Sequence, residues 1–185
     1  MNSEHWKTIH GWFDFANIYN DWAKNIKDGD IIIELGTWLG KSTCYLAQKL
    51  KDSGKKVKFY ACDLFIRPNE EPFVAGCPDK DFYKIFLSNL KMQGVDDFVL
   101  PVILDSIEFA KQFDDGSVSF LFVDDSHHPS HVYRELHAWY PKLKIDGVFA
   151  GHDALYIRDE ALQNFMKDKD LTYVVDGNSW ITRRK

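Results

Sequence analysis

The alternation of short apolar runs with amphipathic stretches is the feature that most constrains how this chain can fold. Ile31–Leu35 is a short apolar run, which is typical of a central parallel strand buried on both faces. Further strands are predicted at 57–62, 98–103, 117–123 and 147–150, and helices between them at 41–53, 80–93, 106–113 and 129–143. Repeated strand–helix units predict a parallel sheet with helices on both faces.

The end of the chain departs from this alternation. After a predicted helix at 158–168, the runs 171–175 and 179–182 flank Asp176-Gly177. An Asp-Gly pair between two strand-like runs indicates a hairpin, so the last strand should run antiparallel to its neighbour. The predicted fold is therefore a doubly wound α/β fold, with a mostly parallel seven-stranded Rossmann-like sheet and a C-terminal antiparallel hairpin.

A chain of 185 residues predicts one domain spanning 1–185. Within the N-terminal segment 1–29, apolar residues spaced three and four apart predict an amphipathic helix over 3–27. The segment 64–79 contains three of the six prolines and lies at the carboxyl edge of the sheet, where α/β folds bind ligands. We expect this segment to be a lid or substrate loop.

Charge and composition limit the partners that the chain can have. The formal charge of −5 argues against nucleic acid, whose affinity depends on neutralising phosphates with Lys and Arg. No apolar stretch approaches the roughly 20 residues that a membrane helix needs, and the first residues lack a signal-peptide pattern. Three cysteines without CxxC spacing fit reduced thiols. We therefore expect a cytoplasmic protein that binds neither nucleic acid nor membrane.

A nucleotide site is predicted at the end of the first strand. Gly36 and Gly40 form a tight turn between a strand and a helix, where a ligand can approach the backbone and the helix N-terminus. With Glu34 the spacing is ExGxxxG, which differs from the GxGxxG of NAD-binding proteins and from the phosphate-binding P-loop. Asp63 closes the second strand and can accept hydrogen bonds from ribose hydroxyls. Each feature alone is also typical of an ordinary turn or strand end, but together they favour a phosphate-poor, cationic nucleotide.

A second cluster follows the fourth and fifth predicted strands. Five of the seven histidines lie between His127 and His152. Asp124 ends the fourth strand, and His152-Asp153 follow the fifth, which is adjacent to it in a doubly wound sheet. Carboxylates and imidazoles thus meet at one sheet edge, and oxygen-rich sites of this kind bind Mg²⁺ or a similar hard cation.

The runs ELGTWLGKS (34–42) and VDDSHHPSHVYRELHAWYPKLKIDGVFAGHD (123–153), together with Asp63, resemble class I S-adenosylmethionine-dependent methyltransferases. The similarity is to the small-molecule O-methyltransferase branch, which includes macrolide sugar O-methyltransferases and relatives called cephalosporin hydroxylases. The resemblance covers roughly residues 30–153 and implies S-adenosylmethionine as cofactor. It implies cofactor contacts by Glu34, Gly36, Thr37, Gly40, Ser42, Asp63, Asp105, Ser106 and Asp124.

These implied contacts divide by the part of the cofactor they serve. Residues of the glycine turn would hold the methionine end, Asp63 the ribose, and Asp105-Ser106 the adenine side. Leu104 stands where the family usually has glycine, and Asp105 or Ser106 can equally cap the following helix.

The resemblance also implies a divalent metal: Asp124, His127 and Asp153 match the pattern of the metal-dependent relatives residue by residue, and the predicted metal ligands are Asp124, His152 and Asp153. His152 stands where the metal-dependent relatives usually have a carboxylate, which would favour Mn²⁺, Fe²⁺ or Zn²⁺ over Mg²⁺ or mean that no metal binds. Asp125 replaces a usual glycine.

A neutral hydroxyl needs a base or metal to lose its proton, so His127 is the candidate base and Asp124 the second candidate catalytic residue. His127 can alternatively be a polar loop residue before the helix at 129–143.

We therefore expect an S-adenosylmethionine-dependent O-methyltransferase acting on a small hydroxylated molecule, such as a sugar or a natural product. Two alternatives stay open: a non-catalytic binding protein with this fold, and an NAD-dependent oxidoreductase, against which Glu34 argues. A homodimer contact or an acceptor-site cover is predicted from the aromatic residues of the first helix, which are Trp6, Trp12, Phe13, Phe15, Tyr19 and Trp22.

Overall fold

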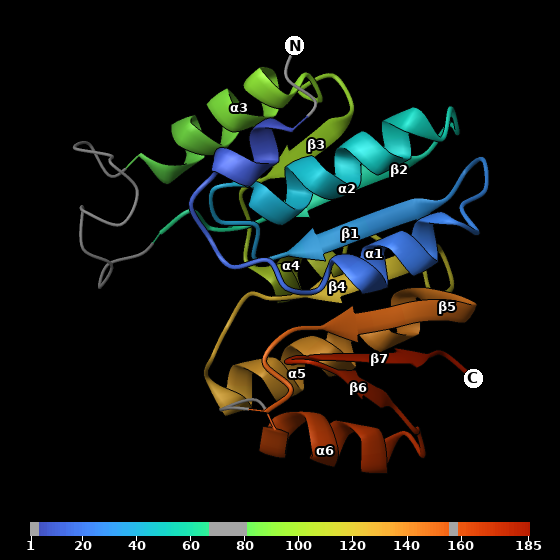
Figure 1. Ribbon diagram of the computed structural model, residues 1–185. Coiled ribbons are helices and arrows are strands. Elements are labelled where there is room, and N and C mark those ends of the chain that lie inside the picture. Colours follow the sequence, from blue (N-terminus) through green and yellow to red (C-terminus); the bar gives the residue numbers. More distant parts are fainter. Residues whose placement is uncertain (1–3, 67–80, 156–158) are drawn as a thin grey trace.

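The computed structural model describes residues 4–66, 81–155 and 159–185 (Figure 1). Its sheet has seven strands in the order β3-β2-β1-β4-β5-β7-β6. The strands are β1 (Ile31–Leu35), β2 (Lys58–Cys62), β3 (Val99–Val102), β4 (Val118–Val123), β5 (Leu143–Gly151), β6 (Val174–Asp176) and β7 (Ser179–Arg183). The helices are η1 (His5–Thr8), α1 (Ala16–Ala23), α2 (Lys41–Asp52), α3 (Phe82–Gln93), α4 (Ser106–Ala110), α5 (Pro129–Trp139), η3 (Tyr140–Lys142) and α6 (Asp159–Asp168).

Strand directions confirm the predicted sheet. The pairs from β3 to β5 are all parallel, whereas β7 runs antiparallel to both β5 and β6. The strand order reverses between β1 and β4, and open α/β sheets bind ligands at the carboxyl ends of the strands beside such a reversal. The topology therefore places the glycine turn after β1 and the acidic residues after β4 at the expected binding edge.

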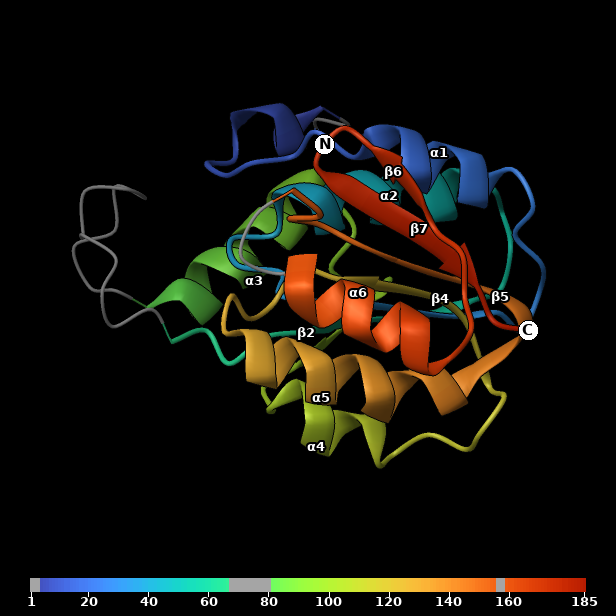
Figure 2. The ribbon, with the colours of Figure 1, turned by 90° about the horizontal axis from the view of Figure 1, so that it is seen from below.

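Helices cover both faces of the sheet, with α1, α2 and α3 on one face and α4, α5 and α6 on the other (Figure 2). Successive strand residues point to opposite faces, so Phe120 and Phe122 pack with the first group and Leu121 and Val123 with the second. All six residues of β4 are buried. No helix in the described ranges is both long and apolar enough to cross a membrane.

Local signals explain several helix boundaries. The side chain of Asp81 accepts a hydrogen bond from the Lys84 backbone amide at the start of α3, and Gly94 in the left-handed region ends that helix. Pro129 is the first residue of α5, where its missing amide proton costs nothing. The predicted helix 129–143 overran, because Tyr140–Lys142 form a separate short helix and β5 begins at Leu143.

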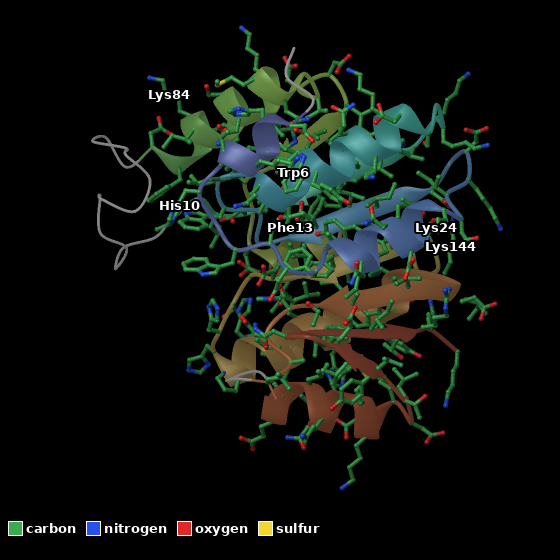
Figure 3. All side chains as sticks on the ribbon, viewed as in Figure 1. Trp6, His10, Phe13, Lys24, Lys84 and Lys144 are labelled. Carbon is green, nitrogen blue, oxygen red and sulfur yellow. The ribbon has the colours of Figure 1, made fainter. Side chains whose placement is uncertain are left out.

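The predicted N-terminal helix over 3–27 is wrong. Two short helices, η1 and α1, are separated by an irregular segment over 9–15. The aromatic residues of this region pack inward without forming one helix face. Trp6 of η1 and Phe13 of the irregular segment both contact Tyr45 of α2, and Figure 3 labels both. Phe15 stacks on Phe122 with ring centroids 4.3 Å apart.

These contacts bury aromatic residues that the predicted dimer contact was expected to cover. Of the six aromatic residues in question, all in the described part of the chain, Trp12 alone is exposed, with 75% of its surface accessible. The homodimer stays a prediction that this segment no longer supports. The predicted lid over 64–79 falls mostly on residues 67–80, which lie outside the described residues.

Candidate active site

A cavity of about 1060 Å³ lies at the carboxyl ends of β1, β4 and β5. Its walls come from the N-terminal segment 10–14, the turn 36–42, the loop 124–128, the pair His152-Asp153, and Asn178. Of the predicted site residues, it brings together Gly36, Thr37, Ser42, Asp124, His127, His152 and Asp153. A smaller hollow of about 600 Å³ between α5 and α6 contains none of them.

The turn after β1 is held tightly against the neighbouring strands. Gly36 has φ of 79°, and a Cβ atom there would lie 2.0 Å from the carbonyl oxygen of Asp124. The Gly36 amide donates to the Cys62 carbonyl at 2.9 Å. At Gly40, with φ of 84°, a Cβ atom would lie 2.9 Å from the Phe86 ring. Glycine at both positions therefore lets the turn follow this path beside the cavity.

Thr37 lies in this turn and carries the clearest sign of a missing partner. The residue is buried and lines the cavity, yet its Oγ1 atom has no hydrogen-bond partner among the described residues. Burying an unsatisfied hydroxyl costs about 1–3 kcal/mol. A polar ligand in the cavity would remove that cost, so this wall fits the polar methionine end of S-adenosylmethionine.

Glu34 lies beneath the turn and does not line the cavity. Its carboxylate accepts hydrogen bonds from the Tyr19 hydroxyl at 2.9 Å and the Thr43 hydroxyl at 2.6 Å. Burial raises the pKa of the Glu34 carboxyl to about 7, and these bonds, with one from Ser42, offset only part of the effect. Glu34 thus links α1, β1 and α2, and its contact with the cofactor stays a prediction.

Asp63, Asp105 and Ser106 lie outside the cavity wall. The two oxygens of buried Asp63 accept from the backbone amides of Phe65 at 2.7 Å and Trp38 at 2.8 Å. Asp105 caps α4, as its alternative interpretation predicts. The roles of these residues toward ribose and adenine stay predictions.

Asp153 is the centre of the acid and histidine cluster. Its Oδ2 lies 3.1 Å from Nε2 of His127, and its Oδ1 lies 3.1 Å from Nδ1 of His152. Asp124 Oδ1 lies 3.7 Å from the same His152 nitrogen. Asn178, in the turn between β6 and β7, donates to Asp153 Oδ1 at 3.1 Å. Loops after three strands thus converge on one carboxylate.

The environment of His152 favours its charged form. Burial alone lowers the pKa of His152, but the hydrogen bond with Asp153 and the charges of Asp124, Asp153 and Asp14 outweigh burial and raise it above the ordinary value. A positive charge is therefore stabilised at this point, whether carried by a proton or by a metal ion.

The donor set also fits a divalent cation. Asp124, His152 and Asp153 each offer a ligand atom, and these atoms lie within 4.8 Å of one another. Two carboxylates and an imidazole suit Mn²⁺, Fe²⁺ or Zn²⁺. Asp125, His131 and Glu135 form a second group whose ligand atoms also lie within 4.8 Å of one another.

Sequence reasoning missed several residues of this site. Asp14 reaches His152, and His10 and Trp12 line the cavity from the same segment, on which Figure 3 labels His10. Trp12 stacks on Trp38 of the turn, with ring centroids 5.6 Å apart. Asp14, His10 and Trp12 were missed because a helix was predicted over them. The hairpin signal identified Asp176-Gly177 but gave no reason to single out the neighbouring Asn178.

The fold and the match to a family model together identify a class I S-adenosylmethionine-dependent methyltransferase. A family model described as "Methyltransferase domain" matches residues 33–154, and the chain belongs to that family. No curated protein sequence matches the chain significantly.

Solved structures share the fold at low sequence identity. A SAM-dependent O-methyltransferase from Thermotoga maritima is 18% identical, with a TM-score of 0.64 and coverage of 94% of this chain and 67% of that one. The O-methyltransferase of tomaymycin synthesis from Streptomyces achromogenes, solved with SAM, is 13% identical, with a TM-score of 0.66 and coverage of 96% and 82%. A protein described as an rRNA methylase from Clostridium thermocellum is 14% identical, with a TM-score of 0.67 and coverage of 95% and 99%.

Proposed function

We propose that this protein transfers a methyl group from S-adenosylmethionine to a hydroxyl of a small molecule. The observation that carries the proposal is the His127–Asp153 pair in the same cavity as the glycine turn and the unsatisfied Thr37 hydroxyl. The acidic balance of the chain supports a small acceptor over a nucleic acid. The buried free thiols of Cys44 and Cys62 support work in a reducing compartment such as the cytoplasm.

The cofactor supplies an electrophilic methyl group on a sulfonium centre. Gly36, Thr37 and Ser42 would hold its methionine end, and Asp124 would face its positive charge. We assign ribose to Asp63 and adenine to Asp105 and Ser106 by the family resemblance. The Asp63 carboxylate already accepts hydrogen bonds from two backbone amides. Ribose hydroxyls would have to bind to the same carboxylate alongside these amides.

His127 is proposed to remove the acceptor's proton. A neutral imidazole carries one proton, and Nε2–H donating to Asp153 leaves the lone pair on Nδ1 free to accept. Asp153 orients the ring and stabilises the imidazolium that forms. The His127 side chain is 67% exposed, so an acceptor can reach it from the cavity.

A divalent metal would be held by Asp124, His152 and Asp153. When bound, such an ion lowers the pKa of a coordinated hydroxyl and so shares the work of deprotonation. Asp153 serves both arrangements, because one of its oxygens faces His127 and the other faces His152.

The proposal is tested by S-adenosylhomocysteine formation over a panel of catechols and methyl glycosides, with and without Mg²⁺ or Mn²⁺. We expect His127→Ala to slow turnover by about 10²- to 10⁴-fold. Calorimetry should show that the affinity of this variant for S-adenosylhomocysteine stays within about twofold of the wild type, because His127 is proposed to contact the acceptor and not the cofactor.

The matched control is His128→Ala, which removes the neighbouring exposed imidazole; its ring contacts Ser130. Turnover within about threefold of wild type is expected there. Equal loss in both variants would contradict the base assignment. Cofactor binding without transfer to any acceptor would support the non-catalytic alternative.

A further inference from the structure

We propose that Asp14 is a positioning residue that holds His152 with its Nδ1 atom facing Asp124 and Asp153, so that the N-terminal segment forms part of the reaction centre. The inference rests on the proposed function, because it concerns how that site presents a ligand nitrogen to a divalent cation.

The two ring nitrogens of His152 face different groups. Nε2 lies 2.9 Å from Oδ1 of Asp14, whereas Nδ1 lies 3.1 Å from Asp153 and 3.7 Å from Asp124. A carboxylate can only accept a hydrogen bond, so the contact with Asp14 places a proton on Nε2. Nδ1 is then the nitrogen that would serve as a ligand if Asp124, His152 and Asp153 held a divalent cation. Metal-ligating histidines commonly donate their other N–H to a carboxylate in this way.

The backbone around Asp14 is anchored on both sides. The Lys41 ammonium donates to the Gly11 carbonyl at 3.0 Å, which ties the segment to the start of α2. Phe15 is buried, stacks on Phe122 of β4 at 4.3 Å, and faces the His152 ring at 5.3 Å. Asp14 is therefore delivered to His152 by the packing of its neighbours.

The competing explanation is an ordinary surface ion pair. The Asp14 side chain is 62% exposed, and exposed pairs contribute little to stability. The His152 side chain, however, is only 12% exposed, and its other nitrogen faces two carboxylates. Loss of an ordinary surface pair would leave the Mn²⁺ affinity nearly unchanged, so Mn²⁺ binding separates the two explanations.

The experiment compares Asp14→Ala, Asp14→Asn and the wild type, using Mn²⁺ alone as the probe in electron paramagnetic resonance titrations. We expect Asp14→Ala to weaken Mn²⁺ binding about 10- to 100-fold. Asp14→Asn, whose amide oxygen can still accept from Nε2, should fall between the two. The control is Asp21→Asn, which removes an exposed carboxylate of α1 that pairs with Lys24 and should leave Mn²⁺ affinity unchanged.

A second readout does not depend on metal. The ring ¹⁵N signals of His152, assigned by their loss in His152→Gln, should shift at Nε2 in Asp14→Ala while those of His127 stay in place. Unchanged Nε2 signals, equal Mn²⁺ affinity in Asp14→Ala and wild type, or no Mn²⁺ binding by the wild type would overturn the proposal. The affinity for S-adenosylhomocysteine should stay within about twofold of the wild type in the Asp14 and Asp21 variants. If the wild type does not bind S-adenosylhomocysteine, that result refutes the proposed function instead.

Discussion

Gly36 occupies the tightest backbone position of the site. Its Cβ would meet the carbonyl of Asp124 at 2.0 Å, so an added methyl group must push apart the ends of β1 and β4. Both strands are buried at the centre of the sheet, and neither end can move without disturbing the cavity. This position thus couples the glycine turn to the proposed reaction centre.

We expect Gly36→Ala to lower the free energy of unfolding by at least about 2 kcal/mol, from the clash and the positive φ together. Gly54→Ala is the control, because Gly54 has φ of 68° with nothing within 4 Å of the added Cβ, so only the backbone strain of about 1 kcal/mol applies. Urea denaturation measures both variants. Equal losses of stability in the two variants would show that the backbone near Asp124 moves away from an added Cβ at position 36 without cost.

The short helix α4 shows how one side chain can serve an element and a site. Asp105 accepts hydrogen bonds from the amides of Ile107 at 3.0 Å and Glu108 at 3.1 Å, which makes it the N-cap of α4. The family resemblance assigns the same residue to the adenine side of the cofactor. The two roles have separate consequences, because a cap acts on stability and a ligand contact on affinity.

Asp105→Ala should cost about 1 kcal/mol of stability through the lost cap, and Asp105→Ser, which keeps a capping oxygen, should recover most of it. Thermal denaturation and calorimetry with S-adenosylhomocysteine separate the roles. If both variants bind the ligand as tightly as the wild type, Asp105 is only a cap.

At the scale of the whole molecule, Glu34 couples stability to pH. Burial raises the pKa of this carboxyl from 4.5 to about 7, so the folded protein binds the proton more tightly than the unfolded chain does. Its contribution to stability is complete below about pH 4.5 and is lost as the pH rises through about 7.

The free energy of unfolding of the wild type should therefore fall by up to about 3 kcal/mol more than that of Glu34→Gln between about pH 5 and pH 8. The amide of the variant does not ionise, so its stability lacks this dependence, although the altered bonds to Tyr19 and Thr43 lower it at every pH. Parallel pH profiles from chemical denaturation would rule out this coupling.

The N-terminal segment shows where sequence reasoning reached its limit. Spacings of three and four between aromatic residues are typical of a helix, but Trp6, Phe13 and Phe15 reach different neighbours on α2 and β4 through an irregular backbone. Periodicity reports that side chains are buried; it does not report which partner buries them. The contact of Asp14 with His152 could not be predicted for the same reason.

The sequence by itself determined the succession of strands and helices along the chain, the antiparallel hairpin and the glycine turn. It also determined the acidic and histidine residues that follow the strands, because each of these depends on neighbours along the chain. Only the tertiary structure decided that Asp14 meets His152 across 138 positions, that Asn178 meets Asp153, and that Glu34 lies under the cavity. Such contacts arise from how the helices and loops pack on the sheet, and no local pattern encodes which distant side chains packing will bring within hydrogen-bond distance.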